Sequence, residues 1–446
     1  MSSPPIDHET PVQGALIIHP EREGRGGARS SQARLEEAEG LALALDLEIR
    51  RGLVAPVRKR MPATLFGKGK VAEIGELCEE LEIDVAVVDD ALTPVQQRNL
   101  EKAWKVKVID RTGLIVEIFA RRARTREGRL QVELARLSYE RSRLVRTWTH
   151  LERQRGGFGV MGGPGETQIE TDRRLLAEKI GRLKKELVEV RRTRTLQRSA
   201  RKRRPYPVVA LVGYTNAGKS TLFNRLTDSK VMAEDMLFAT LDPTLRMLNL
   251  PDGRPAILSD TVGFISDLPH ELVEAFRATL EEVKEADVIL HVRDIASPES
   301  AAEAVDVREV LERLGVDMDE RRVLEVWNKI DLTPEEDRPM LEGDARRAHP
   351  PALLVSAVTG EGVTPLLLAV AGLVDESPAV EAHLPAGEGA AIAWLYQNGR
   401  VIDRHTEDDG AVRMAVRLTP KAMGQFEQLF PRIDLGAVSL PDEDPV

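Results

Sequence analysis

The amino-acid sequence predicts an α/β protein in which two parallel-sheet domains are separated by a helical segment and followed by a small α+β unit. Short apolar runs alternate with amphipathic stretches before residue 119 and again after residue 207, which is the pattern of βαβ units. Between them, apolar residues recur at steps of three and four, as in helices that pack on each other. The length of 446 residues suits about three domains of ordinary size.

The composition is that of a globular protein, with 42% hydrophobic and 30% charged residues. Cys78 is the only cysteine, so no internal disulfide can form and a reducing compartment fits. The longest apolar runs are too short to cross a bilayer, and the N-terminus has no basic stretch followed by an apolar one. We therefore expect a cytoplasmic protein without an integral membrane span, and a monomer by default.

The N-terminal part predicts a small α/β domain over residues 14–119. Residues 1–13 before it are rich in proline and serine and lack periodicity, which predicts a disordered tail. The apolar and amphipathic runs place strands at residues 15–18, 85–88 and 106–109, and helices at residues 31–45, begun by a capping serine, and after Thr93-Pro94.

Residues 120–204 predict an antiparallel helical hairpin. Apolar side chains fall at helical spacing in two runs, namely Leu130, Leu134, Leu137, Leu144, Trp148 and Leu151, then Leu176, Ile180, Leu183, Leu187 and Val190. The connection at residues 156–165 holds six glycines and Pro164, and it is longer than a hairpin needs. We interpret this loop as a probe at the tip of an arm rather than as a spacer.

The hairpin also carries a strong positive charge. The chain has a formal net charge of −10, yet residues 121–204 hold 25 Lys and Arg against 10 Asp and Glu. A solvated helical face is the ordinary explanation of a charge-rich segment, but here the excess has one sign and is confined to one segment. This pattern favours a polyanionic partner, nucleic acid above all.

The C-terminal residues 378–446 predict a small α+β unit after a polar linker. Strands are expected at residues 391–396, 400–403 and 412–418, and a helix at residues 420–429.

A phosphate-binding loop is the strongest chemical signal. Between a predicted strand at residues 208–212 and a helix, the chain reads Gly213-Tyr214-Thr215-Asn216-Ala217-Gly218-Lys219-Ser220. In such a loop the backbone N–H groups point at the phosphates, the lysine neutralises the β- and γ-phosphates, and the serine hydroxyl ligates Mg²⁺. We therefore predict a nucleotide site in which Lys219 is catalytic and Ser220 is a metal ligand.

Two further segments fit a nucleotide-dependent switch. The first, Phe238-Ala239-Thr240-Leu241-Asp242-Pro243-Thr244, offers two threonines that could reach Mg²⁺ when a γ-phosphate is present, and spacing does not choose between Thr240 and Thr244. The second is Asp260-Thr261-Val262-Gly263, at the end of a strand-like run. Its carboxylate can hold a Mg²⁺-bound water, and the Gly263 amide can sense the γ-phosphate, which gives Gly263 a catalytic role.

The segment Asn328-Lys329-Ile330-Asp331 indicates the base. A carboxylate at Asp331 can accept from both guanine N1–H and the 2-amino group, which adenine does not offer, and Lys329 would lie over the base plane. Ser356-Ala357-Val358 follows another strand and supplies backbone that closes on the guanine oxygen. Because the five elements occur in order, residues 205–377 predict a Ras-like P-loop G domain that binds GTP and GDP and hydrolyses GTP with Mg²⁺.

The chain resembles the HflX family of translation-factor-class GTPases over nearly its whole length. Outside the G domain the resemblance depends on residues 108–115, 119–125, 148–154 and 163–174, and inside it on residues 213–220 and 237–244. The family pattern implies that Thr240 is the Mg²⁺ ligand. In some members of the family the N-terminal part binds or hydrolyses ATP. Here Gly67-Lys68-Gly69-Lys70 is the one run like a phosphate loop in that part, and a turn into a helix explains those residues better.

The resemblance further implies a ribosome-associated GTPase that binds the large (50S) subunit, with rRNA as the partner of the basic hairpin. Its role would be to split or rescue stalled ribosomes under stress, or to serve ribosome biogenesis. An alternative of another class is an RNA-binding assembly module that uses GTP mainly as a structural ligand. A signalling GTPase with protein partners is a third possibility, and the basic hairpin argues against it.

The residue after Gly263 is Phe264, where related switches often carry a glutamine that orients the attacking water. Because Phe264 has no polar atom, we expect low intrinsic turnover, with the missing group supplied by a partner, a neighbouring loop or a cation. Asn216 in the P-loop keeps K⁺ open as that cation.

Overall fold

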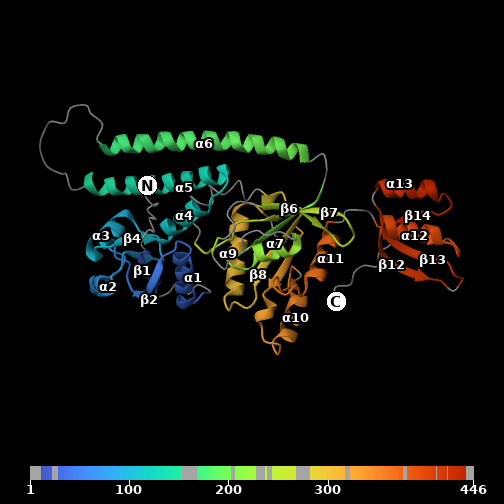
Figure 1. The fold of residues 1–446 in the computed structure, drawn as a ribbon, viewed down its shortest axis with the longest axis horizontal. Helices are drawn as coiled ribbons and strands as arrows, with labels where there is room; N and C mark the ends of the chain where they lie inside the picture. The colour runs from blue at the N-terminus through green and yellow to red at the C-terminus, as the bar shows by residue number, and fades with distance from the viewer. Residues whose placement is uncertain are drawn as a thin grey trace, which may run out of the picture. The chain divides into compact units, whose positions relative to one another are not determined.

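The computed structural model has the expected α/β architecture, with a separate small sheet at the C-terminal end (Figure 1). It describes residues 12–22, 29–152, 168–201, 206–227, 237–238, 244–267, 282–316, 322–350, 352–374, 379–407, 409–418 and 420–437. The chain divides into two compact units, one of residues 1–249 with 255–366 and the other of residues 250–254 with 367–446.

The N-terminal domain is built on a four-stranded sheet in the order β2-β1-β3-β4, in which all described pairs are parallel. Its strands are β1 (Gly14–Arg22), β2 (Glu48–Val57), β3 (Val85–Val88) and β4 (Lys107–Asp110). Its helices are α1 (Ser31–Leu43), α2 (Lys68–Glu80), α3 (Pro94–Trp104) and α4 (Arg111–Arg122). Alternate residues of the strands face the two sides, so α1 and α4 cover one face and α2 and α3 the other.

Local chemistry explains where these helices begin. Ser30 caps α1 by accepting a hydrogen bond from the Ala33 amide, and Thr93 forms a reciprocal capping box with Gln96 ahead of Pro94. Helix α2 begins directly after Gly67, so the glycine–lysine run is a turn into a helix, as the sequence favoured. Strand β2 was not predicted, because its charged residues and Pro56 hide the strand pattern in the sequence. In the described sheet β2 is an edge strand, a position in which a proline is tolerated.

Two long helices, α5 (Arg126–Glu152) and α6 (Gln168–Arg201), form the predicted hairpin and run side by side in Figure 1. Leu137, Ile180 and Leu183 form its buried core, with Leu130, Leu134 and Leu176 packed against them. The side chains of Leu144, Trp148 and Leu151 and the glycine-rich connection at residues 156–165 lie outside the described residues.

Asp110 attaches the hairpin to the N-terminal domain. Its Oδ1 accepts hydrogen bonds from the Gly113 amide at 2.8 Å, which caps α4, and from the Tyr139 hydroxyl at 2.5 Å. Its Oδ2 accepts from the Arg143 guanidinium at 2.6 Å, and that guanidinium lies 4.1 Å from the centre of the Tyr139 ring. Arg143 is therefore engaged inside the protein and is not one of the hairpin's free surface charges.

The G domain contains a six-stranded sheet in the order β10-β9-β8-β5-β7-β6, in which β6 is the antiparallel member of the described pairs. The strands are β5 (Val208–Gly213), β6 (Thr244–Asn249), β7 (Pro255–Asp260), β8 (Val288–Asp294), β9 (Val323–Asn328) and β10 (Ala352–Leu354). The described helices are α7 (Lys219–Thr227), α9 (Ser300–Arg313), α10 (Arg338–Arg347) and α11 (Val363–Leu373). The carboxyl ends of β5, β7 and β9 meet at one edge, where a ligand site of an α/β sheet is expected.

The C-terminal sheet is antiparallel in the order β12-β13-β11-β14, with strands β11 (Ala379–Leu384), β12 (Arg400–Thr406), β13 (Val412–Arg417) and β14 (Leu435–Ala437). Helix α13 (Pro420–Leu429) is where the sequence placed it. The predicted strand at residues 391–396 is wrong, because these residues belong to helix α12 (Gly389–Asn398). Ala391 and Leu395, four apart on one helical face, are buried, and a short apolar run does not by itself tell a strand from a helix.

Within the described parts of the chain, no helix combines the length and the apolar character that crossing a bilayer would require.

Candidate functional site

The P-loop turns sharply between β5 and α7 because Gly213 and Gly218 adopt backbone conformations with positive φ. At Gly213, φ is 151° and a Cβ atom would lie 2.1 Å from the carbonyl oxygen of Val292, so no other residue fits. The loop is thereby held against the end of β8, and α7 begins at Lys219 with its N-terminus at the loop.

Lys219 is directed into the loop and is only 6% exposed. Its Nζ donates hydrogen bonds to the carbonyl oxygens of Gly213 at 3.1 Å and Tyr214 at 2.6 Å. Burial lowers the pKa of this ammonium to about 8, although the nearby Asp260 carboxylate opposes the shift. A buried cation at the N-terminus of a helix is the electrostatic setting that phosphate oxygens would complete.

Ser220 and Asp260 form the candidate metal position. The Ser220 hydroxyl donates to Asp260 Oδ2 at 2.8 Å, and Asp260 ends β7 with no exposed surface. A hydroxyl beside a carboxylate is the hard-oxygen donor set that suits Mg²⁺. In the described residues no three His, Cys, Asp or Glu side chains gather as a metal site.

The segment from Asp260 to Phe264 is attached to the P-loop through its backbone. The Phe264 amide donates to the Gly213 carbonyl at 3.1 Å, and the Thr215 amide donates to the Phe264 carbonyl at 2.7 Å. The backbone of Gly263 lies against Thr215, while the Phe264 side chain is 1% exposed. This phenyl ring is buried and has no polar atom, so it does not orient a water in this arrangement.

The guanine motif follows β9 and contains a polar atom without a partner. Asp331 Oδ1 is buried and has no hydrogen-bond partner among the described residues. An unpaired acceptor at this position is consistent with a carboxylate that accepts from the guanine N–H donors when nucleotide binds. Lys329, with a positive φ of 67°, pairs with Asp294 at 2.8 Å. These two residues fit the predicted recognition of the base.

Asn328 has a bridging position that the sequence motif does not reveal. Its Nδ2 donates to the Ala217 carbonyl at 2.9 Å, and its Oδ1 accepts from the Ala357 amide at 2.9 Å. It therefore joins the P-loop to the segment Ser356-Ala357-Val358, in which Ser356 is fully buried and Val358 is 65% exposed. The predicted phosphate-binding and base-binding segments are thus brought together at one edge of the sheet.

The first switch segment is described only in part. Residues 239–243, including Thr240, the predicted Mg²⁺ ligand, and Asp242, lie outside the described residues. Phe238 is 2% exposed and has a positive φ of 57°. Its ring does not point to solvent but packs on Phe119 of α4.

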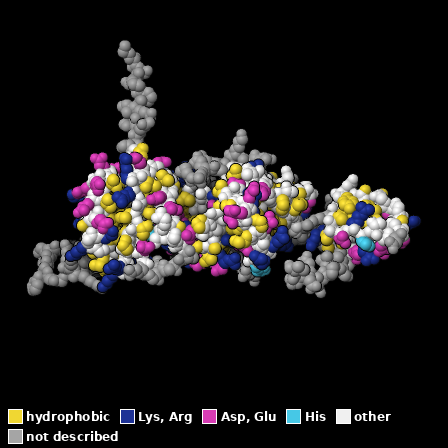
Figure 2. Space-filling model, turned by 90° about the horizontal axis from the view of Figure 1, so that it is seen from below, with side chains coloured by type: hydrophobic (Ala, Val, Ile, Leu, Met, Phe, Trp, Pro, Cys, Tyr) yellow, Lys and Arg dark blue, Asp and Glu magenta, His cyan; other side chains and the backbone are white. Residues whose placement is uncertain are grey.

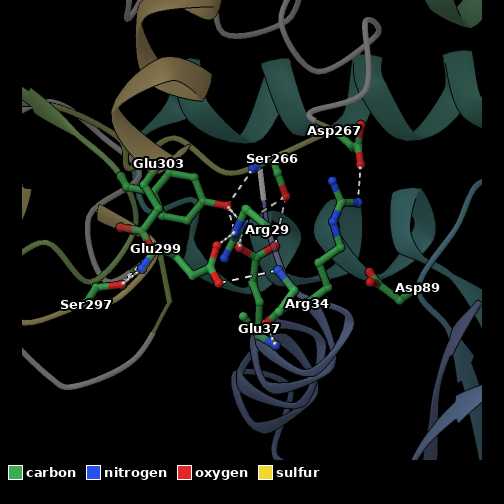
Figure 3. Close-up of polar contacts among 12 residues, drawn as sticks. Arg29, Arg34, Glu37, Asp89, Ser266, Asp267, Ser297, Glu299 and Glu303 are labelled. Carbon is green, nitrogen blue, oxygen red and sulfur yellow. Dashed lines mark hydrogen bonds and ion pairs between the residues drawn. The ribbon is translucent and has the colours of Figure 1, made fainter. Parts of the chain in front are cut away.

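Sequence reasoning missed a buried polar cluster that touches the P-loop from the N-terminal domain (Figure 3). The Tyr214 hydroxyl, in the second position of the loop, donates to Glu37 of α1 and accepts from Arg29 at 2.7 Å. Arg111 at the start of α4 binds Glu37 and Ser266 in the same cluster. One sequence feature could have pointed to this cluster. Arg111 lies in residues 108–115, a run that supports the family resemblance but to which the sequence assigned no function.

Comparisons with known proteins cover nearly the whole chain. Residues 32–120 match the family described as "GTP-binding GTPase N-terminal", and residues 122–201 match "GTP-binding GTPase Middle Region". Residues 208–329 match "50S ribosome-binding GTPase", and residues 344–437 match "HflX C-terminal domain".

Two curated relatives and one solved structure illustrate these matches. The GTPase HflX of Magnetococcus marinus is 53% identical over 397 residues, which cover 89% of this chain and 90% of that protein. The GTPase HflX of Escherichia coli is 44% identical over 385 residues, which cover 86% and 89%. A crystal structure of a GTP-binding protein from Sulfolobus solfataricus in complex with GDP is similar at 23% identity and a TM-score of 0.44, covering 81% of this chain and 98% of that one. The family matches and the high identity over most of both chains show that this chain is a member of the HflX family of GTPases.

Proposed function

We propose that this GTPase binds the large ribosomal subunit through the α5–α6 hairpin, and that it splits or rescues stalled ribosomes in the cytoplasm. The observation that carries the proposal is a basic arm joined to a G domain whose residues match the description "50S ribosome-binding GTPase". The G domain supplies a switch that differs between GTP and GDP, and the arm supplies attraction to rRNA.

The exposed charges of the hairpin support rRNA as its partner. Arg129, Arg141, Arg173, Lys179, Arg182, Lys184 and Lys185 are all exposed on α5 and α6. In the view from below, the face of the N-terminal and G domains shows Lys and Arg interspersed with Asp and Glu (Figure 2). A phosphate backbone is attracted by an excess of one sign, and the hairpin is where the sequence has that excess.

The nucleotide chemistry assigns a task to each predicted site residue. The P-loop amides and Lys219 would bind the phosphates, Asp331 and Lys329 the guanine, and the Gly263 amide the γ-phosphate. P-loop GTPases use Mg²⁺, and we propose Ser220 and Thr240 as its protein ligands, with Asp260 holding a bound water. The ion would neutralise charge that develops on the phosphates during transfer.

Ribosome co-sedimentation tests the binding part of the proposal. The full chain is mixed with purified large subunits in the presence of a non-hydrolysable GTP analogue, GDP or no nucleotide, and the bound fraction is measured. We expect binding to be at least about tenfold tighter with the analogue than with GDP, since one form of a switch must favour the bound state.

Each other outcome identifies a competing function. Equal binding with GTP analogue and GDP would favour the RNA-binding assembly module in which GTP is a structural ligand. Absence of binding at low salt with every nucleotide would exclude the large subunit as the partner. The Lys219→Ala variant, which should not bind nucleotide, is the matched control and should behave as the nucleotide-free protein does.

A further inference from the structure

One face of the N-terminal domain contacts three loops of the nucleotide site. It is formed by Glu37 and Gly40 of α1 and by Arg111 and Phe119 of α4, with Arg29 just before α1. We call it the α1–α4 face. It meets the P-loop at Tyr214, the first switch segment at Phe238 and the second, taken here as residues 260–266, at Ser266.

The polar half of the contact centres on Ser266, two residues after Phe264. Arg111 donates to the Ser266 carbonyl at 3.0 Å and to its hydroxyl at 3.1 Å, and the Ser266 amide donates to the Tyr214 hydroxyl at 2.8 Å. The Ser266 hydroxyl also donates to Glu37 at 3.1 Å (Figure 3). Two residues from the N-terminal domain thus hold the end of the second switch segment through its side chain and its backbone.

The charges in this contact are buried and paired. The side chains of Arg29, Glu37 and Arg111 are each at most 7% exposed, and Asp89 binds the second branch of Arg111 at 2.5 Å. Burial raises the pKa of the Glu37 carboxyl, but the charges of Arg111 and Arg29 outweigh it and hold that pKa below its usual value. A buried ionic network of this kind resists small displacements, because moving one partner leaves charges uncompensated.

The apolar half of the contact holds the first switch segment. The Phe238 and Phe119 rings meet edge to face, with centroids 4.7 Å apart and planes at 83°. Leu237 approaches α1 at Gly40, where a Cβ atom would lie 3.1 Å from a Leu237 methyl group. Thr240 follows Phe238 by two residues, a tether of roughly 7 Å at full extension.

Two of the three loops that contact this face are switch segments, which change when the γ-phosphate arrives. In switch GTPases the two switch segments are ordered on the γ-phosphate and its metal ion, and are released after hydrolysis. A loop held by the N-terminal domain cannot at the same time take a different position on the nucleotide. Lys219 is linked to the same contact. Its Nζ donates to the carbonyl oxygens of Gly213 and Tyr214, and the Tyr214 hydroxyl donates to Glu37.

We propose that the α1–α4 face is an intramolecular docking surface for both switch segments, and that its docking competes with GTP. Phe119 and the pair Glu37–Arg111 are positioning residues that act through Phe238, Tyr214 and Ser266. Because binding linkage is reciprocal, GTP loosens the face from the switches, and a loosened face raises the affinity for GTP relative to GDP. The proposal rests on GTP binding by the G domain and not on the ribosomal role.

Nucleotide affinities of two variants in the N-terminal domain test the linkage. Glu37→Gln weakens the polar half and Phe119→Leu the apolar half, and neither residue belongs to the predicted nucleotide site. The dissociation constants of fluorescent GDP and of a fluorescent non-hydrolysable GTP analogue are measured on the full chain. We expect the ratio of GDP to GTP-analogue dissociation constants to rise at least about fivefold in each variant.

A matched control separates docking from the loss of just any ion pair across this contact. Arg34 of α1 pairs with Asp267 at 3.2 Å across the same contact, but its side chain is 31% exposed and that of Asp267 is 57% exposed. An exposed pair contributes little, so Arg34→Ala should leave the ratio unchanged. The Glu37→Gln and Tyr214→Phe changes should be non-additive in the ratio, because both act through one hydrogen-bonded pair.

Hydrogen exchange of the Ser266 amide distinguishes nucleotide-dependent docking from a role of these residues in stability alone. In the unaltered chain the Ser266 amide should exchange faster with GTP analogue than with GDP, and Phe119→Leu should reduce that difference. An unchanged or lowered affinity ratio in both folded variants would overturn the proposal. So would a Ser266 amide equally protected in both nucleotide states.

Discussion

Lys219 is where local physical chemistry makes the sharpest prediction. Its ammonium is buried, and its pKa is lowered to about 8 from an ordinary value of 10.5. The folded, nucleotide-free protein therefore binds fewer protons than the unfolded chain between these two values, so its stability rises with pH across that window. Below about pH 8 the full cost of the buried charge is present, and bound phosphates would offset it.

Nucleotide binding should therefore be coupled to proton uptake at alkaline pH. If phosphates restore the ordinary pKa of Lys219, binding of GDP should take up a fraction of a proton, and this fraction should grow as the pH rises from about 7.5 to about 9. Isothermal titration in buffers of different ionisation enthalpy measures this number. A value that stays constant over the range would show that Lys219 does not meet the phosphates.

The residues of the site also show how far a motif can be interpreted. The P-loop, Asp260 and Asp331 follow strands whose apolar runs are local, so their meeting at one sheet edge was predictable. The bridge made by Asn328 was not, because its partners Ala217 and Ala357 offer only backbone atoms. The same holds for Tyr214, whose hydroxyl finds partners 177 and 185 residues away.

The hairpin shows what an element's periodicity can and cannot predict. Its helices and their apolar contacts followed from the spacing of leucines, since neighbours on one helical face are three or four residues apart. Which arginines are free did not follow, because Arg143 lies in the basic run yet is bound to Asp110. The wrong strand at residues 391–396 has a similar origin, since packing, not composition, placed Ala391 and Leu395 against the C-terminal sheet.

Exposed charges on α6 should therefore set ribosome affinity. Lys179, Arg182 and Lys185 lie about one turn apart and are exposed. Replacing all three by glutamine should weaken binding to the large subunit. It should also make the plot of log affinity against log salt concentration less steep, by about 2 to 3 in the magnitude of its slope. Affinity for GTP should be unchanged, because these exposed residues belong neither to the predicted nucleotide site nor to the α1–α4 face.

The control for this change removes the same charge elsewhere. Arg313, Arg346 and Arg347 are 69%, 82% and 75% exposed on α9 and α10. Their triple glutamine variant should keep the binding and the salt dependence of the unaltered protein. If both triple variants lose the same affinity, net charge rather than the hairpin is responsible.

The protein as a whole has a nucleotide site whose groups for binding and for hydrolysis are not equally complete. We propose Lys219, Ser220, Asp260 and Asp331 as its binding residues, whereas the residue after Gly263 is a buried phenylalanine. The amide and the carbonyl of Phe264 are both hydrogen-bonded to the P-loop. A neighbouring polar side chain therefore could not take the place of the ring unless this segment moved. Binding without fast hydrolysis is what a protein needs if its GTP state must persist until a partner is reached.

Turnover should therefore rise when the large subunit docks. Hydrolysis by the free chain should be slow, and saturating large subunits should accelerate it at least roughly tenfold, which corresponds to about 1.4 kcal/mol of activation free energy. Phosphate release is measured in Na⁺ and in K⁺ buffer, because Asn216 leaves a cation open as the missing group, and the Lys219→Ala variant gives the background. A tenfold gain that needs ribosomes in both buffers places the missing group on the ribosome or on a loop that docking moves. If K⁺ alone gives the full rate, the cation completes the site, and ribosome-gated hydrolysis is wrong.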